Sequence, residues 1–218
     1  MNKDIKKTVA VPIPSIRRMP AYLSYAKQLL KKGQKYVSST QIGAYMNIDS
    51  TQVTKDLSYT SIVGKTRVGY ETEKLIDILT EFLGFNVVDK AFLVGAGSLG
   101  SALLHDRGLL HFGLEIIAAF DVDPNVVNTE INGVNVYHLD NFRDLANEKK
   151  VAMGILTVPA EYSQTVADLM VAWGIKAIWN FTPARIKVPN DIIVQNTTMY
   201  SNLAVIFNKL HGNDKVIK

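Results

Sequence analysis

One stretch of the sequence, residues 90–123, constrains the fold more than any other. An apolar run, 91–94, predicts a buried parallel strand, and a glycine-rich turn follows it with the G-x-G-x-x-G spacing of dinucleotide-binding folds. In that spacing the first glycine allows a tight turn, the second lets the backbone approach a pyrophosphate, and the third lets the next helix pack close to the strand. A helix that begins here presents free N–H groups to an anion. We therefore predict that a dinucleotide binds at Gly95, Ala96, Gly97, Ser98, Leu99 and Gly100.

A second strand and an acid complete this unit. The run 114–120 is apolar and ends on Asp121, about 20 residues past the last glycine, where a carboxylate accepts a hydrogen bond from a ribose 2′-hydroxyl. Val122 and Asp123 follow, and no Arg or Lys lies nearby in the sequence. A ribose 2′-phosphate would therefore meet two negative charges. We predict that Asp121, Val122 and Asp123 select NAD(H) over NADP(H).

Strands and helices continue to alternate beyond this unit, which predicts an α/β fold with a doubly wound parallel sheet, the Rossmann fold. The predicted strands are 134–137, 151–158, 177–181 and 192–195, and the predicted helices are 140–149, 160–173 and 199–210. Ligands bind beyond the carboxyl ends of such strands, so two loops are candidates to close over the nicotinamide: Thr157-Val158-Pro159 and Asn180-Phe181-Thr182-Pro183. Ordinary loop chemistry, in which proline ends a strand, explains both loops equally well.

Composition excludes several classes of protein. The chain has 218 residues, 47% of them hydrophobic, which is enough for two small domains with buried cores. It has no cysteine, so disulfides and thiolate metal sites are excluded, and its acids and His do not cluster at metal-ligand spacing. The start of the chain is polar and basic, and no apolar run approaches the roughly 18 residues of a membrane span. We expect a cytoplasmic protein without a bound metal.

The positive charge is concentrated in the first 84 residues, which carry a net charge of +6, whereas the remainder carries −2. This basic segment opens with a helical pattern, 15–32, in which Pro20 suggests a start near Met19. Two short helices follow, and each has the spacing of a capping box: Ser38 with Gln41, and Asp49 with Gln52. Two capped helices joined by a tight turn are typical of a helix-turn-helix.

The second of these helices would turn small polar and basic side chains outward, of the size that contacts base edges and phosphates: Thr51, Gln52, Thr54, Lys55 and Ser58. Residues 62–70 then predict a short β-hairpin with Lys65 and Arg67 near its tip, like the wing of a winged helix. An ordinary amphipathic helix with a solvated lysine-rich surface is the alternative. The expected division is a winged helix-turn-helix domain over 1–84, a Rossmann domain over 85–198 and a C-terminal helix and tail over 199–218.

Together these segments resemble the Rex family of redox-sensing transcriptional repressors, over nearly the whole chain. The segments that carry the resemblance are Tyr36-Val37-Ser38-Ser39, Lys55-Asp56-Leu57-Ser58-Tyr59, Gly64-Lys65, Val68-Gly69-Tyr70, the glycine turn, 119–124, Thr157-Val158-Pro159-Ala160 and Asn180-Phe181-Thr182-Pro183-Ala184-Arg185. The resemblance implies a homodimer that binds double-stranded operator DNA when NADH is low and releases it when NADH rises relative to NAD. It also implies that Lys55 and Lys65 touch the DNA, and that the terminal helix is swapped between subunits. We include Ser39 in the predicted DNA-binding set.

The resemblance further implies a switch, in which this chain departs from the usual residues. Asp106 stands where a Tyr is common and Thr198 where an Asp is usual, while Arg18 matches the family's switch arginine. We hypothesise that Asp106 pairs with Arg18 in one state. Met199 and Phe207 of the terminal helix complete the predicted switch and interface set. Thr54, and the pair Thr66-Arg67, also depart from the more basic residues usual at the DNA surface, which predicts a different operator preference.

An NAD-dependent oxidoreductase is the alternative function. Such an enzyme needs an acid or base beside the nicotinamide, but none of the four His follows a strand in that half of the sequence. Tyr70 and Lys74 have Tyr-x-x-x-Lys spacing, but they precede the nucleotide unit and overlap the predicted wing. A Rossmann fold without this machinery favours a protein that senses NADH, with Phe181 and the terminal helix forming an apolar pocket for the neutral reduced ring. A corepressor-type binder of another small ligand is a third possibility.

Overall fold

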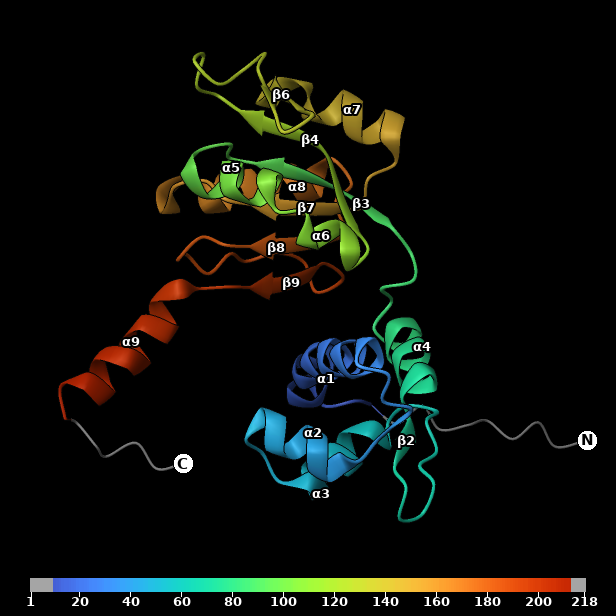
Figure 1. Ribbon diagram of the computed structural model, residues 1–218. Coiled ribbons are helices and arrows are strands. Elements are labelled where there is room, and N and C mark those ends of the chain that lie inside the picture. The colour runs from blue at the N-terminus through green and yellow to red at the C-terminus, as the bar shows by residue number, and fades with distance from the viewer. Residues whose placement is uncertain (1–9, 213–218) are drawn as a thin grey trace, which may run out of the picture. The chain divides into compact units, whose positions relative to one another are not determined.

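The computed structural model describes residues 10–212, and the chain forms two compact units with their boundary in the sequence between Val87 and Val88 (Figure 1). Each unit is described by itself. The predicted boundary between residues 84 and 85 lies three residues earlier. The predicted separate segment from residue 199 onward is grouped with the second unit. Residues 1–9 and 213–218 of the predicted terminal domains lie outside the described residues.

The first unit is built around α1, which spans Ile13–Lys31 and begins earlier than predicted. Its N-cap is Pro12, and a second proline lies in the first turn, where a missing N–H group leaves no helical hydrogen bond unmade. Pro20 lies inside the helix without ending it, because Met19, Tyr22 and neighbouring apolar side chains are fully buried and hold both sides of the helix in the core. The predicted start near Met19 is therefore wrong.

Two short helices follow, α2 over Ser39–Met46 and α3 over Ser50–Leu57. The capping box predicted for α2 is present, with both the Ser38 and the Gln41 side chains bonded to the opposite backbone N–H. The one predicted for α3 is wrong: Asp49 accepts from the N–H of Thr51, and the Gln52 side chain does not return to the cap. Gln52 donates instead to Asp56 at 2.8 Å, an acceptor inside the same helix.

The segment predicted as a wing is a tight turn, with far less strand than expected. Lys65 and Gly69 form an isolated antiparallel bridge, and Arg67 lies in the turn between them with a left-handed φ of 63°. Lys65 thus stands at the base of the turn, and only Arg67 is near its tip. The chain then pairs β2, Tyr70–Glu71, with β1, Tyr36–Val37, before α4 begins at Thr72 and runs to Phe82.

The second unit is a seven-stranded sheet with the order β5-β6-β4-β3-β7-β8-β9, and Figure 1 shows the labelled strands, from β6 to β9, stacked in this order. All neighbours are parallel except β5 and β6, which confirms the doubly wound sheet. The strands are β3 (Asp89–Val94), β4 (Leu114–Asp121), β5 (Glu130–Ile131), β6 (Val134–His138), β7 (Met153–Leu156), β8 (Ala177–Asn180) and β9 (Ile193–Asn196). Helices connect the central strands on both sides of the sheet. Apolar side chains of these strands are therefore buried on both faces, in two separate clusters.

The helices of this unit range from single turns to the 12 residues of the last helix. They are α5 (Ser98–His105), α6 (Gly108–His111), the 3₁₀ turn η1 (Leu139–Asn141), α7 (Phe142–Lys149), the 3₁₀ turn η2 (Ala160–Tyr162), α8 (Ser163–Ala172) and α9 (Met199–Leu210). The chain crosses from β3 to β4 on one side and returns to β7 on the other. The carboxyl end of β3 is therefore the topological switch point, where such folds bind ligands.

Candidate functional site: a nucleotide cavity and a helix-turn-helix surface

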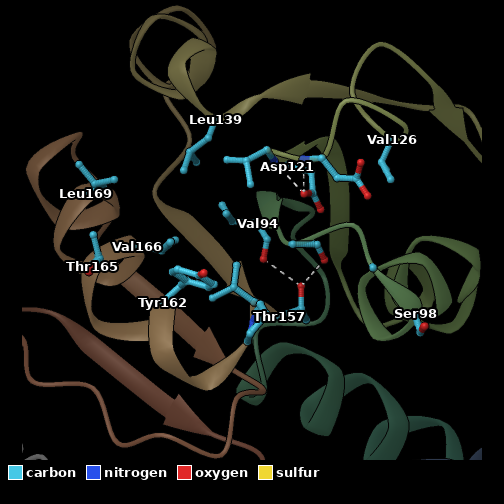
Figure 2. A pocket seen from close by; sticks show the side chains of 16 residues that line it. Val94, Ser98, Asp121, Val126, Leu139, Thr157, Tyr162, Thr165, Val166 and Leu169 are labelled. Carbon is cyan, nitrogen blue, oxygen red and sulfur yellow. Dashed lines mark hydrogen bonds between the residues drawn. The ribbon is translucent and has the colours of Figure 1, made fainter.

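A cavity of about 760 Å³ opens at this switch point, beyond the carboxyl ends of β3, β4 and β7 (Figure 2). Figure 2 shows Thr165 and Leu169 on one side of it and Val126 and Ser98 on the other. Most of the lining is apolar, and the few polar groups come from the strand ends, the glycine turn, and Tyr162 and Thr165 of η2 and α8. The lining residues are Val94, Gly95, Gly97, Ser98, Asp121, Val122, Asp123, Val126, Leu139, Thr157, Val158, Pro159, Tyr162, Thr165, Val166 and Leu169.

The three glycines of the turn have the geometry that the sequence predicts. Gly95 has a φ of +100°, and a Cβ there would lie 2.8 Å from the backbone of Thr157 and Val158. At Gly100 a Cβ would overlap the carbonyl oxygen of Gly95, so α5 packs directly on the turn. Gly97 is different, because no protein atom lies within 4 Å of the position of its Cβ. Its open face is where a phosphate group can approach the backbone at the start of α5.

Asp121 ties the glycine turn to the end of β4. Its Oδ2 accepts from the N–H of Ala96 at 2.7 Å, and its Oδ1 accepts from the N–H groups of Val122 at 2.7 Å and Asp123 at 3.0 Å. A carboxylate has about four acceptor positions, so one remains for a ribose hydroxyl. Asp123 is exposed and accepts from Asn125 through Oδ1 only, and within residues 10–212 its Oδ2 has no partner.

The loop after β7 lies at the cavity as predicted. The hydroxyl of Thr157 donates to the carbonyl region of the glycine turn, with oxygen–oxygen distances of 2.9 Å to Val94 and 2.7 Å to Gly95, and Val158 and Pro159 line the same wall. Sequence reasoning missed a further group from η2 and α8: Tyr162, Thr165, Val166 and Leu169. The signal for it was the start of a helix directly after a strand-ending proline at the carboxyl edge of the sheet.

The loop after β8 does not line this cavity, and its predicted place over the nicotinamide stays a prediction. Asn180 is fully buried, and its amide donates to Ala184 and Asn196 at 2.8 Å each. Its Oδ1 accepts from the backbone and hydroxyl of Thr182. These side chains build the turn, and Phe181 packs on Trp179, 4.6 Å between ring centroids. Leu99, Gly100 and Pro183 are likewise outside the lining, as is Ala96, whose N–H serves Asp121.

In the first unit, α3 presents Thr51, Thr54, Lys55 and Ser58 as exposed side chains, as predicted. Gln52 is the exception, because it is half-buried and bonded to Asp56. Ser39 is half-buried in the first turn of α2. The turn after α3 supplies two further exposed cations, Lys65 and Arg67. Lys65 is held by Tyr36: its Nζ donates to the Tyr36 hydroxyl at 3.0 Å and lies 5.1 Å from the ring centroid.

Arg18, the predicted switch residue, binds a different acid from the one hypothesised. Its Nε and Nη2 donate to the two oxygens of Asp56 at 2.7 and 2.8 Å, and Tyr22 donates to the same carboxylate at 2.7 Å. Burial alone would raise the pKa of Asp56, but these hydrogen bonds, with that from Gln52, lower it to about 2. Burial and the bond to Asp56 raise the pKa of Tyr22. Asp106 is exposed and accepts from the N–H of Gly108 at 2.7 Å.

The terminal helix α9 leaves its apolar side chains uncovered in the single chain. Met199 is 63% exposed and Phe207 49%, and no residue of the helix is buried. Thr198, the preceding residue, is the N-cap but makes no side-chain cap bond. Such a surface needs a partner to cover it.

Two kinds of site are absent from the part of the chain that the structure describes. No group of three or more His, Asp or Glu is placed to hold a metal ion. No helix among residues 10–212 has the length and apolar character needed to span a membrane.

Two family models match the chain, and each covers one unit. A model described as a putative DNA-binding protein N-terminus matches residues 10–58, and a model described as a CoA binding domain matches residues 86–184. Both matches agree with the two-unit division of the structure, and together they place a DNA-binding module ahead of a nucleotide-binding one.

Known proteins similar to the chain over its whole length include several with one name. A redox-sensing transcriptional repressor Rex from Bacteroides fragilis is 56% identical over 216 residues and covers 98% of both chains. The protein of the same name from Bacteroides thetaiotaomicron is 57% identical over 204 residues, 94% of this chain and 93% of its own.

Solved structures with the same fold include those of a Rex-family repressor called RSP. The complex of RSP with β-NAD+ and operator DNA has a TM-score of 0.89 at 32% identity, covering 94% of this chain and 95% of RSP. The complex of RSP with β-NADH has a TM-score of 0.84 at the same identity, covering 94% and 97%.

Proposed function

Because the chain belongs to the Rex family of redox-sensing transcriptional repressors, we propose that it binds operator DNA through its first unit and NAD(H) through its second. NADH would release the DNA. The observation that carries the proposal is the cavity at the switch point, with the open face of Gly97 on one side and the acids of β4 on the other. As a DNA-binding repressor the protein would act in the cytoplasm.

The residues around the cavity support one direction for the dinucleotide. Its pyrophosphate would lie over Gly97 and Ser98, where the first N–H groups of α5 are unpaired within the helix. The adenosine ribose would then reach Asp121 and Asp123, with the adenine between Val126 and Leu139 on one wall and α8 on the other. The nicotinamide would extend past Thr157 and Pro159.

The ligand class is open to a direct test, because one matching model is named for CoA. CoA and NADPH both carry a phosphate on the adenosine ribose, and both would bring it near the carboxylates of Asp121 and Asp123. We expect calorimetric titration to show binding of NADH and NAD, and at least tenfold weaker binding of NADPH and CoA. A preference for CoA would contradict the proposal.

The cavity favours a sensor over an oxidoreductase. Among its lining residues the titratable side chains are Asp121, Asp123 and Tyr162, and no His or Lys is present. The two acids lie at the adenosine end in the proposed pose. Tyr162 lies beside Thr157 at the other end, but no Lys or His among the lining residues is present to form a proton-transfer pair with it, in agreement with relatives named as repressors.

We propose that the repressor is a homodimer joined partly by α9. The exposed apolar face of this helix, from Met199 to Leu210, supports the proposal, since a second copy offers the cover that its own unit does not. Light scattering should give twice the 24.2 kDa mass of one chain. Phe207→Asp should shift the mass toward one chain.

The redox response would be tested with a gel shift of duplex DNA that the chain selects from a random pool. NADH should release the DNA and NAD should not. The predicted pairing of Arg18 with Asp106 belongs to this response, and Arg18 has N–H groups left for a second anion after its two bonds to Asp56. If Asp106→Asn responds to NADH like the wild type, that pairing has no role in the switch.

A further inference from the structure

We propose that Arg18 and Asp56 are positioning residues for DNA recognition, whose ion pair fixes the rotation of α3 about its own axis. The rotation decides which side chains α3 presents to base edges. The inference rests on the proposed DNA-binding function and adds two residues that lie away from the exposed face of α3.

Asp56 is the only charged side chain that is buried within residues 10–212. Its side chain is 0% exposed, while that of Arg18 is 26% exposed. It accepts hydrogen bonds on both oxygens: from Arg18 and Tyr22 on Oδ2 at 2.7 Å each, and from Arg18 and Gln52 on Oδ1 at 2.8 Å each. Two of the donors, Arg18 and Tyr22, belong to α1, so the carboxylate joins α3 to another helix through a defined set of directions.

The helix geometry places this carboxylate beside the apolar face. At about 100° per residue, Asp56 lies roughly 60° from Val53 around the axis of α3, and Gln52 lies on the same flank. Val53 and Leu57 are buried in the core. The opposite side of the helix carries the exposed polar residues, Thr51, Thr54, Lys55 and Ser58.

Apolar contacts alone fix this rotation weakly, for two reasons. The helix has only eight residues, about two turns, so Val53 and Leu57 provide most of its apolar anchorage. Hydrophobic burial is also non-directional, and a small rotation would keep both side chains covered. A bidentate guanidinium–carboxylate pair is directional, because two parallel hydrogen bonds hold the planes of both groups. The two oxygens of Asp56 therefore fix the rotation of α3, which apolar burial leaves undetermined.

A role in overall stability predicts different behaviour. A buried ion pair contributes little net stability compared with apolar side chains, and the best-supported use of such pairs is to specify one arrangement over others. If the pair only stabilises the unit, a folded variant without it should keep the wild-type ratio of affinities for selected and random DNA. If the pair fixes α3, the ratio of selected to random DNA should fall even in folded protein.

The test compares Arg18→Met with Arg17→Met in the full-length chain. Arg17 is the neighbouring residue on α1 and is exposed, so its substitution removes the same charge without touching Asp56. The probes are a duplex that the wild-type chain selects from a random pool and a shuffled duplex of the same composition. Affinity for both is measured over a series of salt concentrations, and helix content by circular dichroism.

We expect Arg18→Met to lower the ratio of affinities for selected and shuffled duplex at least tenfold. Its salt dependence should match that of Arg17→Met, because a residue that acts by holding Asp56 makes no phosphate contact of its own. Arg17→Met should keep the wild-type ratio. If Arg18→Met loses helix content, Asp56→Asn decides, since it keeps the shape and an acceptor oxygen. A folded Asp56→Asn chain should lose at least threefold in the ratio.

Two results distinguish a failure of the positioning role from a failure of the proposed DNA binding. A wild-type chain that selects no duplex from the pool contradicts the proposed DNA binding itself. A wild-type chain that selects one, with a folded Arg18→Met or Asp56→Asn variant that keeps the full ratio, overturns the positioning role and leaves the DNA binding intact.

Discussion

The two units each hold a carboxylate that accepts several hydrogen bonds, but the donors differ. Asp121 in the second unit accepts from backbone N–H groups only. They belong to Ala96 in the glycine turn and to Val122 and Asp123, which follow Asp121 itself. Asp56 in the first unit is bonded by the side chains of Arg18, Tyr22 and Gln52, two of them more than 30 residues away. One site is thus made by the path of the backbone and the other by side chains that fit together.

The difference determines which substitutions each site tolerates. A backbone-built site depends on residues without side chains, because the glycine turn must lie against the loop after β7 and against α5. A site built by side chains depends on the charge and length of its members. The second unit should therefore be sensitive to added atoms, and the first to removed ones.

The largest effect should come from Gly100→Ala, because the new Cβ would overlap the carbonyl oxygen of Gly95. Moving α5 away should cost about 2 to 3 kcal/mol of stability and abolish NADH binding. Gly97→Ala is the matched control, since its Cβ meets no protein atom within 4 Å and should cost less than about 1 kcal/mol. It should still weaken NADH binding at least tenfold, by blocking the pyrophosphate. Urea unfolding and calorimetry measure the two quantities; equal stability of the two variants would contradict the packing argument.

The next largest effect is a loss of stability of the first unit at low pH. The pKa of Asp56 is lowered from 3.8 to about 2 in the folded chain, so its contribution to stability is complete above pH 3.8 and is lost as the pH falls toward 2. The contribution is about 2 kcal/mol. Hydrogen exchange of the α1 and α3 amides, followed by mass spectrometry in the full chain, should show the first unit opening over this range.

Asp56→Asn provides the control for that measurement. The amide does not titrate, so the variant should be less stable at neutral pH and should lose part of its pH dependence between about 4 and 2. A variant with the wild-type pH profile would show that other carboxylates govern the acid response of the first unit.

A smaller effect is expected at Asp121. In Asp121→Asn one oxygen can still accept from Val122 and Asp123, but the amide nitrogen would face the N–H of Ala96, which costs about 1 to 2 kcal/mol. Asp123→Asn should change stability by less than about 0.5 kcal/mol, because that side chain is exposed. Urea unfolding, followed by the fluorescence of the two Trp, reports the second unit, where both lie. Equal losses would mean that Asp121 does not brace the turn.

The same difference explains how much of the molecule could be predicted from the sequence. The glycine turn, β3, β4 and Asp121 lie within about thirty residues, and local spacing determines their contacts. The parallel sheet was predicted because each strand is an apolar run followed by a helix. The capping box of α2 was predicted for the same reason, since both of its members are three residues apart.

Contacts between distant segments could not be predicted in this way. The capping box of α3 failed because Gln52 has a competing acceptor in Asp56, and that carboxylate is held in place by Arg18, 38 residues away. The wall of the cavity formed by α8 depends on how that helix packs on the face of the sheet, where Val166 belongs to the same cluster as Val94. The loop at Asn180 was a candidate for the ligand with ordinary loop chemistry as the equal alternative, and the bonds among its polar groups within the turn could not be predicted from the sequence.

The smallest effect should come from Tyr36→Phe. It tests whether the predicted DNA surface, like the site at Asp56, loses function when atoms of a side chain are removed. The hydroxyl of Tyr36 accepts from Lys65 and raises the pKa of that lysine. Without it the ring still lies under the ammonium group, so Lys65 keeps its charge and loses only its fixed position. We expect an operator affinity about two- to threefold weaker, with an unchanged salt slope. In a Lys65→Met background, Tyr36→Phe should have no further effect, because the hydroxyl acts only through the lysine. Equal losses in both backgrounds would mean that Tyr36 contacts the DNA on its own.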